Sequence, residues 1–393
     1  MRLVELQECC RIINGSTPSR NKKEYWDGDI LWFTPKDLSG LKSKYIEESP
    51  ECITLDGYNS CSTTMIPSGS LLFTSRAPIG HLAINKKEAC TNQGFKTLVP
   101  NEEVDVEYLY YVLKKNVPQL QDLGNGATFK ELSKATISKF KIPLPPLEEQ
   151  KKIAAILDAA DDYRQKTKAL IDKYDQLTQS LFLDMFGDPV TNPKGWDITT
   201  IGAMFKVKGG KRLPKGSVYS DEKTDHPYLR VTDFQRNGIK SSDLRYISKE
   251  IHSKISRYIL KSEEVYISIA GTIGLAGFIP EKLNGANLTE NAAKFCALPG
   301  THVLKEYLSY YLNSSFTQAN IKSKTMAVGV PKLAIFRIEE LPYINAPIHM
   351  QQRFVERINQ IEKQKQQAEA SLVKAEDLFN SLLQKAFKGE LTN

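Results

Sequence analysis

Apolar side chains recur at alternating intervals of three and four residues in two long stretches of the chain, residues 147–186 and 351–388. This spacing lines them along one side of an α-helix and is typical of helices that pack lengthwise on another helix. Because a long isolated helix is marginally stable in water, we expect the two helices to pair as an antiparallel coiled coil; packing on other chains is the alternative. The expected seams are Ile153, Ile156, Ala160, Tyr163, Thr167, Leu170, Tyr174, Leu177 and Leu181 in the first helix, and Phe354, Ile358, Ile361, Lys365, Ala368, Leu372, Ala375, Phe379 and Leu382 in the second.

The other residues show shorter apolar runs separated by turn residues. Residues 68–74 and 81–84 are expected to be strands on either side of the turn Ala77-Pro78-Ile79-Gly80, and residues 105–115 have the spacing of a helix. This mixture predicts an α+β fold.

The whole pattern occurs twice, about 200 residues apart. A proline-rich segment precedes each long helix and is expected to be extended, because proline fixes φ and lacks an N–H donor. The repeat predicts one fold used twice with different surface residues. The corresponding segments are Trp32–Leu38 and Tyr228–Phe234, Ile66–Phe73 and Leu260–Ile267, Thr91-Asn92 and Glu290-Asn291, Tyr108–Leu113 and Tyr307–Leu312, and Ile142–Gln150 and Leu341–Gln352.

We therefore expect two similar α+β domains separated by two long antiparallel helices, with a pseudo-two-fold axis between the halves. The expected segments are residues 1–142 for the first domain, 143–188 for the strap and first helix, 189–343 for the second domain, and 344–393 for the second strap and helix. A helix of about 40 residues is roughly 60 Å long, so we expect the helix pair to hold the domains apart.

Charge distinguishes the two halves. The formal net charge of the 393 residues is +7. Residues 190–347 contain 22 Lys/Arg and 14 Asp/Glu, whereas residues 1–146 contain 18 and 17. A basic domain attracts the phosphate backbone of nucleic acids.

No apolar run reaches the length of a membrane span, the start is too acidic for a signal peptide, and the six cysteines form no C-x-x-C pair. We expect a cytoplasmic protein with reduced thiols.

Motifs that would carry chemistry are missing from the sequence. There is no phosphate-binding G-x-x-x-x-G-K-[ST] loop, no G-x-G-x-x-G loop and no H-E-x-x-H pair, and the five histidines are scattered. Leu144-Pro145-Pro146-Leu147 is not the Asn/Asp-Pro-Pro-aromatic motif of a DNA methyltransferase. We expect no catalytic site and no metal site.

Three segments resemble the DNA specificity (S) subunit of type I restriction–modification systems. They are Leu132–Ile153 with its Ile142-Pro143-Leu144-Pro145-Pro146 strap, the linker Phe186-Gly187-Asp188-Pro189 with Pro193-Lys194-Gly195-Trp196, and the tail Leu378–Leu391. The resemblance covers essentially the whole chain. The second strap, Leu341–Pro347, departs from the tighter form of the first, so the correspondence of single residues is weaker there.

The resemblance implies a non-catalytic subunit with two target-recognition domains, each recognising one half of a bipartite site in double-stranded DNA. The helix pair would set the spacer and dock two methyltransferase (M) subunits, and restriction (R) translocase-nuclease subunits would join them. S-adenosylmethionine, ATP and Mg²⁺ would belong to those partners, with no cofactor in this chain. The alternative is a coiled-coil scaffold that tethers two protein-binding modules; a free-standing nuclease or methyltransferase is disfavoured by the missing motifs.

Candidate DNA contacts are cations, which attract phosphates, and side chains that fit base edges. In the first domain they are Arg20, Lys22, Lys23, Lys36, Arg76, Gln93, Thr128 and Lys130. In the second they are Lys211, Arg212, Lys215, Arg230, Thr232, Thr272, Asn291 and Lys332, with Lys211-Arg212 in a glycine-rich loop as the favoured phosphate site. The tyrosines of residues 108–111 and 307–311 have helical spacing, which favours the core over base stacking.

Overall fold

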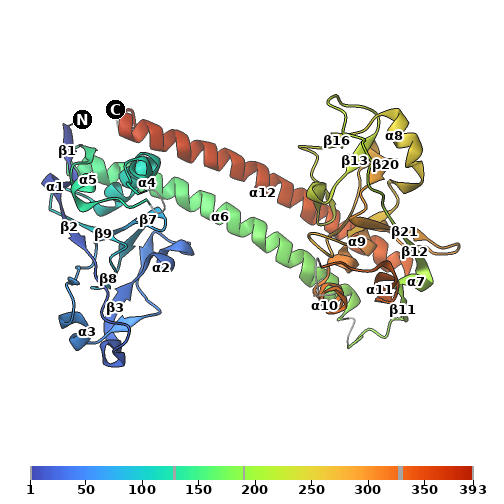
Figure 1. Ribbon diagram of the computed structural model, residues 1–393, viewed down its shortest axis with the longest axis horizontal. Helices are drawn as coiled ribbons and strands as arrows, with labels where there is room; N and C mark the ends of the chain where they lie inside the picture. The colour runs from blue at the N-terminus through green and yellow to red at the C-terminus, as the bar shows by residue number, and fades with distance from the viewer. Residues whose placement is uncertain (1, 127–129, 189–190, 326–330, 392–393) are drawn as a thin grey trace. The chain divides into compact units, whose positions relative to one another are not determined.

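The computed structural model describes residues 2–126, 130–188, 191–325 and 331–391. The chain forms two compact units: unit 1 contains residues 1–168 and 369–393, and unit 2 contains residues 169–368. Each unit combines an α+β region with part of both long helices, α6 (Leu147–Phe186) and α12 (Ile348–Lys388) (Figure 1). The predicted bounds of the first helix are confirmed, and the second begins three residues earlier than predicted.

Unit 1 contains a five-stranded sheet in the order β2-β9-β6-β7-β4 and a three-stranded sheet in the order β5-β3-β8. The strap strand β10 is extended, as its proline content predicts, and it pairs antiparallel with the N-terminal strand β1. Strands β6 and β7 occupy the two predicted runs, and α4 extends seven residues beyond the predicted helix. The elements are β1 (Arg2–Glu5), α1 (Leu6–Cys9), β2 (Cys10–Asn14), η1 (Lys23–Tyr25), β3 (Trp26–Phe33), α2 (Pro35–Ser39), β4 (Tyr45–Ile46), β5 (Cys52–Ile53), α3 (Leu55–Asn59), β6 (Leu71–Ser75), β7 (Ile79–Asn85), β8 (Cys90–Thr91), β9 (Lys96–Pro100), α4 (Val106–Asp122), α5 (Lys134–Ser138) and β10 (Lys141–Leu144).

Unit 2 repeats this plan with a sheet in the order β12-β21-β18-β19, a second sheet in the order β16-β13-β20-β17, and the strap pair β11-β22. Its elements are β11 (Ile198–Thr200), α7 (Ile201–Met204), β12 (Phe205–Gly209), β13 (Pro227–Leu229), η2 (Val231–Asp233), β14 (Phe234–Gln235), β15 (Gly238–Ile239), β16 (Arg245–Tyr246), α8 (Lys249–Lys254), η3 (Ser256–Tyr258), β17 (Ile259–Leu260), β18 (Val265–Ser268), β19 (Ala276–Phe278), η4 (Glu281–Leu283), β20 (Ala286–Leu288), β21 (Ala292–Ala297), α9 (Lys305–Asn313), α10 (Ser315–Lys324), α11 (Ile335–Glu339) and β22 (Pro342–Ile344).

A fully buried glutamine holds the start of each long helix. In unit 1 the Oε1 atom of Gln150 accepts a hydrogen bond from the N–H of Asp105 at 2.9 Å, and its amide donates to the carbonyl of Pro145 at 2.9 Å. In unit 2 Gln351 makes the same two bonds, with Leu304 and Ala346, at 2.9 and 2.8 Å. Because a buried amide is costly unless it is satisfied, each glutamine ties the strap, the long helix and the start of α4 or α9 together.

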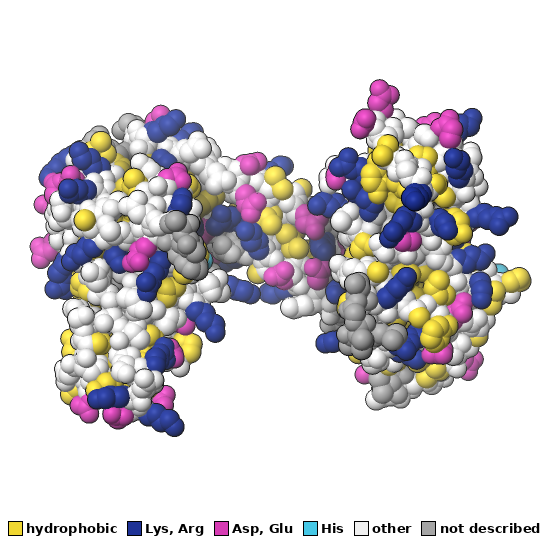
Figure 2. Space-filling model, in the orientation of Figure 1, with side chains coloured by type: hydrophobic (Ala, Val, Ile, Leu, Met, Phe, Trp, Pro, Cys, Tyr) yellow, Lys and Arg dark blue, Asp and Glu magenta, His cyan; other side chains and the backbone are white. Residues whose placement is uncertain are grey.

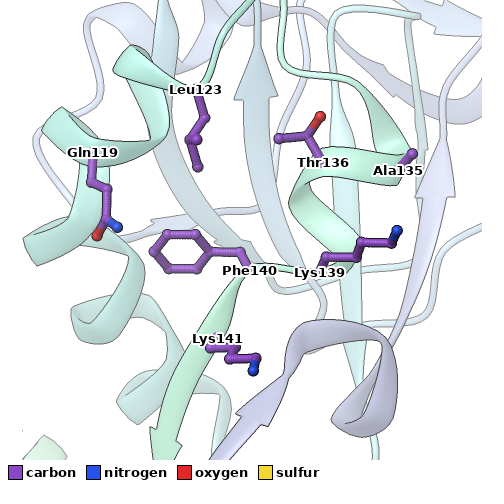
Figure 3. A pocket seen from close by; sticks show the side chains of 7 residues that line it. All are labelled: Gln119, Leu123, Ala135, Thr136, Lys139, Phe140 and Lys141. Atoms are coloured by element: carbon purple, nitrogen blue, oxygen red, sulfur yellow. The ribbon is translucent and has the colours of Figure 1, made fainter.

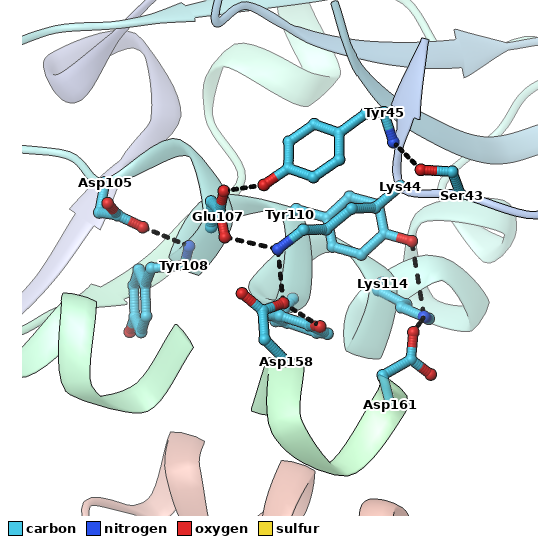
Figure 4. Close-up of polar contacts among 11 residues, drawn as sticks. Ser43, Lys44, Tyr45, Asp105, Glu107, Tyr108, Tyr110, Lys114, Asp158 and Asp161 are labelled. Atoms are coloured by element: carbon cyan, nitrogen blue, oxygen red, sulfur yellow. Dashed lines mark hydrogen bonds and ion pairs between the residues drawn. The ribbon is translucent and has the colours of Figure 1, made fainter. Parts of the chain in front are cut away.

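A cluster of polar side chains joins α6 to the sheet region of unit 1 (Figure 4). The ammonium group of Lys44 lies 2.5 Å from carboxylate oxygens of both Glu107 and Asp158, and the Tyr111 hydroxyl donates to Asp158 at 2.6 Å. Burial alone would raise the pKa of Glu107, but hydrogen bonds with Asp158, Lys44 and Tyr45 outweigh it and lower the pKa to about 2. Burial and the hydrogen bond with Glu107 raise the pKa of Asp158.

The predicted seam of α12 is confirmed, whereas that of α6 is partly wrong. Every seam residue of α12 is buried or half-buried. In α6, however, four predicted seam residues are exposed, whereas the predicted Thr167 is buried and so is the polar Thr178 outside the predicted seam. Arg164 is also largely buried, with its guanidinium 4.4 Å from the ring centre of Phe379. Thr167 donates to the carbonyl of Tyr163, and Arg164 pairs with Asp161, so polar residues occupy part of the buried side and hydrophobicity alone misplaces it. The exposed seam residues are Ile156, Tyr163, Leu170 and Leu177.

The tyrosines at helical spacing lie in the core, as predicted: Tyr108, Tyr111, Tyr307 and Tyr311 are at most 1% exposed, and Tyr110 and Tyr310 are 8% exposed. All six cysteines are free thiols, and Cys9, Cys10 and Cys90 are buried. Within the described part of the chain, no helix has the length and apolar character needed to cross a membrane.

Candidate nucleic-acid interface

In unit 1, five loop segments that are distant in sequence come together beyond the strand ends. Backbone hydrogen bonds join Ser16 N–H to the carbonyl of Thr91 at 2.9 Å, Asn92 to Phe33 at 3.0 Å, and Ser75 to Gly94 at 2.7 Å. A Cβ atom on Gly15 would lie 2.1 Å from the carbonyl oxygen of Asn92, so only glycine fits at this crossing. We call this loop cluster 1, residues 15–17, 33–37, 75–77, 91–95 and 130–132.

Unit 2 builds the same arrangement from different residues. Lys211 N–H donates to Leu288 at 2.8 Å, Thr289 to Leu229 at 3.1 Å, and Ile269 to Asn291 at 2.8 Å. A Cβ atom on Gly210 would lie 2.1 Å from a carbonyl oxygen, here that of Thr289. We call this loop cluster 2, residues 210–212, 229–233, 269–272, 288–292 and 331–333.

These matched hydrogen bonds correct one correspondence expected from the sequence. Asn92 and Thr289 each donate to the end of the equivalent strand, β3 or β13, and Gly94 and Asn291 each accept from the turn after β6 or β18. Asn92 therefore corresponds to Thr289, and Gln93 corresponds to Glu290. The match with Glu290-Asn291 is therefore displaced by two residues. The loops before β9 and β21 are equally long, since Leu98 and Phe295 also occupy equivalent positions, opposite Leu71 and Val265.

The structure brings four of the eight candidate DNA contacts of the first domain to loop cluster 1. Lys36, Arg76, Gln93 and Lys130 lie in it, and all but the half-buried Arg76 are exposed. Arg20, Lys22 and Lys23 lie on the segment that follows residue 17. Thr128 falls outside the described residues.

Ion pairs limit what two of these arginines are free to bind. Glu51 accepts two parallel hydrogen bonds from the terminal nitrogens of Arg20, at 2.5 and 2.9 Å, and the guanidinium lies 3.8 Å from the ring centre of Trp26. Glu131 lies 3.6 Å from Arg76 and 3.5 Å from the buried Lys96. Burial lowers the pKa of Lys96, and Glu131 offsets this only in part.

Loop cluster 2 contains seven of the candidates of the second domain, and Lys215 lies three residues beyond it. Arg230 is held by Asp233 at 2.7 Å and by Asp243 at 3.3 Å, so it supports the loop more than it faces a ligand. Glu290 accepts a hydrogen bond from Nε of Arg212 at 2.6 Å, although the arginine side chain is 79% exposed. The candidates in the cluster are Lys211, Arg212, Arg230, Thr232, Thr272, Asn291 and Lys332.

The lysines of the two clusters carry the unpaired positive charge. In the described residues, no carboxylate forms an ion pair with Lys36, Lys130, Lys211, Lys215 or Lys332. Figure 2 shows Lys and Arg side chains spread over the visible faces of both units, with Asp and Glu between them. The unpaired lysines of the clusters are thus suited to contact phosphates. The arginine–glutamate pairs beside them are suited to contact base edges.

Sequence reasoning missed the acidic partners in both clusters. Glu51, Glu131 and Glu290 each pair with a candidate arginine, and Lys96 shares Glu131. Of these acidic residues, only Glu290 could have been suspected from the sequence, because it lies next to the candidate Asn291.

One hollow in unit 1 is lined by two lysines and by uncharged side chains. It has a volume of about 550 Å³ and is lined by residues of α4, α5 and β10 (Figure 3). Its polar groups are those of Gln119, Thr136, Lys139 and Lys141, with no carboxylate or histidine to act as a base. In the described ranges, no group of three or more His, Cys, Asp or Glu residues is placed to hold a metal ion.

The fold and loops define a duplicated α+β chain with two exposed polar loop clusters. The family model for the type I restriction modification DNA specificity domain matches residues 1–173 and 193–374. The MjaIX type I restriction enzyme specificity subunit of Methanocaldococcus jannaschii is 30% identical, covering 98% of this chain and 92% of its own. The chain therefore belongs to the family of type I restriction-modification specificity subunits.

Further relatives agree with this assignment. The EcoKI specificity subunit of Escherichia coli strain K12 is 23% identical over 93% of this chain and 80% of its own. The crystal structure of the type I restriction-modification S subunit from M. genitalium has a TM-score of 0.56 at 16% identity, covering 98% of this chain and 96% of its own. A chain in a structural study of the assembly and conformational transition of the type I R-M system has a TM-score of 0.63 at 18% identity, covering 99% and 98%. These two structures support the fold.

Proposed function

We propose that this chain is the non-catalytic DNA-recognition subunit of a type I restriction–modification complex. Each loop cluster recognises one half of a bipartite, asymmetric site in double-stranded DNA. The methyltransferase and the translocase-nuclease are partner subunits, and they supply the sites for S-adenosylmethionine, ATP and Mg²⁺.

One observation carries this proposal: the two loop clusters share a backbone frame and differ in side chains. Where cluster 1 has the neutral Thr17 and Gln93, cluster 2 has the charged Arg212 and Glu290. A common frame suits the regular backbone of duplex DNA, and different side chains suit different bases. An asymmetric pair of half-sites follows.

Helix α6 supports the docking of methyltransferase subunits. Its part in unit 1 exposes Ile156 and Tyr163, and its part in unit 2 exposes Leu170 and Leu177, at 37–52% of their surface. Exposed apolar residues at seven-residue intervals on one helix are suited to contact with another protein.

The test uses the full chain purified with its methyltransferase partners. We expect binding to duplex DNA that weakens steeply with salt, and methylation of a two-part site in the genome of a host that expresses the complex. The methylated positions give both half-sites and the spacer. Binding that is insensitive to both salt and sequence would refute the proposal and favour a scaffold.

A further inference from the structure

Glu290 is held in place by its neighbours in loop cluster 2. Its Oε2 atom accepts a hydrogen bond from the Thr289 hydroxyl at 3.0 Å and lies 3.5 Å from the Tyr228 hydroxyl. Its Oε1 atom accepts from Nε of Arg212 at 2.6 Å. Burial alone would raise the pKa of Glu290, but the hydrogen bonds from Arg212, from the backbone and from Thr289, together with the charge of Arg212, outweigh it and lower the pKa. The carboxylate is thus charged and oriented, and it fixes the plane of the guanidinium.

Arg212 differs from the other candidate arginines in which nitrogens remain free. The bond to Glu290 uses Nε, and both terminal nitrogens of Arg212 have no partner in the described residues. In Arg20 both terminal nitrogens donate to Glu51, and in Arg230 one terminal nitrogen is shared by Asp233 and Asp243. In Arg76, one terminal nitrogen lies 3.6 Å from Glu131. Arg212 therefore presents an oriented, two-pronged donor toward solvent.

The chemistry of this pair favours a base over a phosphate. The charges of Arg212 and Glu290 cancel, which weakens attraction for an anion and leaves two N–H donors directed outward. Guanine offers two neutral acceptors, N7 and O6, side by side in the major groove, and a terminal arginine fork matches them. The unpaired Lys215 and Lys332 are better suited to phosphates.

We infer that Arg212 recognises a guanine in the half-site bound by unit 2, and that Glu290 is its positioning residue. This inference rests on the proposed function. The equivalent pair in unit 1, Thr17 and Gln93, has no guanidinium, so the same position in the other half-site is recognised by different chemistry.

The experiment uses the complex of the full chain with its methyltransferase partners and a fluorescent duplex carrying the methylated site of the wild type. Each guanine of both half-sites is replaced in turn by 7-deazaguanine, which lacks N7, and then by adenine. At one guanine we expect the wild type to lose roughly 5- to 150-fold in affinity on change to adenine, and part of that with 7-deazaguanine. Arg212→Gln should lose this discrimination at that guanine alone. Glu290→Gln, which keeps the arginine, should reduce it.

Lys215→Gln is the matched control, because it removes the same charge from the same segment. It should weaken binding to every duplex by one common factor and keep the 7-deazaguanine effect. Unchanged discrimination in the other half-site shows that Arg212→Gln is folded. Retention of the effect in Arg212→Gln, or a uniform loss like that of Lys215→Gln, would overturn the inference and make Arg212 a phosphate contact. If the wild type itself shows no preference among duplexes, the proposed function fails instead.

Discussion

The ammonium group of Lys44 lies 2.5 Å from a carboxylate oxygen of Asp158, and this contact ties the loop before β4 to helix α6. Lys44 also neutralises Glu107, so its loss would leave two partly buried carboxylates without their cation. We expect Lys44→Met to destabilise unit 1 by about 2 kcal/mol, the usual scale for hydrogen bonds to charged groups. Thermal unfolding measures the effect. The exposed Lys42 is the matched control, and an equal loss in Lys42→Met would contradict this role.

The same cluster predicts a pH dependence of stability. The folded pKa of Glu107, about 2, is below the value of 4.5 for an unperturbed glutamate. The contribution of Glu107 to the free energy of unfolding is therefore complete above pH 4.5 and is lost as the pH falls from 4.5 toward 2. The difference in melting temperature between the wild type and Glu107→Gln should shrink over this range. A constant difference from pH 7 to pH 3 would mean that Glu107 acts through packing alone.

Two neighbouring residues of α6 separate its buried and exposed sides. Leu157 is fully buried and Ile156 is 37% exposed. Leu157→Ala should cost about 2–5 kcal/mol in unfolding free energy, whereas Ile156→Ala should cost less than about 1 kcal/mol. Under the proposed function, Ile156→Ala should instead weaken binding of the methyltransferase subunit, measured by titration with the purified partner. Equal losses of unfolding free energy in the two variants would show that Ile156 is on the buried side of α6, as the sequence predicted.

Adjacent glycines test the loop crossing in unit 2. A Cβ atom on Gly210 would lie 2.1 Å from a backbone oxygen, whereas one on Gly209 would lie 3.3 Å from the end of the Ile335 side chain, which is free to shift. Gly210→Ala should destabilise the loop by about 1–3 kcal/mol and weaken recognition by unit 2, and Gly209→Ala should have little effect. Duplex binding and thermal unfolding are the measurements. Near-identical results for the two variants would contradict the claim that the loop crossing requires glycine at position 210.

Lys332 occupies the position in unit 2 that Glu131 occupies in unit 1, as shown by the backbone bridges Ala270–Lys332 and Arg76–Glu131. Being exposed and unpaired, it is suited to a phosphate. Lys332→Gln should weaken binding to all duplexes alike and lower the slope of log K against log[salt] by about 1. A change in base preference at either half-site would instead place Lys332 at a base edge.

Local patterns in the sequence were sufficient to predict the two long helices, the helix at residues 105–115, the extended straps and the repeat, because periodic apolar spacing is a local property. The solvent-facing side of α6 was not predictable, since Arg164 is buried by its contact with Phe379, over 200 residues away. The same limit applies to the site. Arg20 and Arg212 were both candidates, with Arg212 in the favoured glycine-rich loop, but the carboxylates that occupy or free their nitrogens lie 31 and 78 positions away along the chain.

The crossings at Gly15 and Gly210 have an evolutionary consequence. Because backbone atoms alone set the approach of the loops there, the side chains beside them are not needed to maintain it. Residues 16, 17 and 93, and 211, 212 and 290, are therefore able to change without altering the crossing itself. A lineage carrying this chain has a short mutational route from one target sequence to another, along which the backbone frame of the loops is kept.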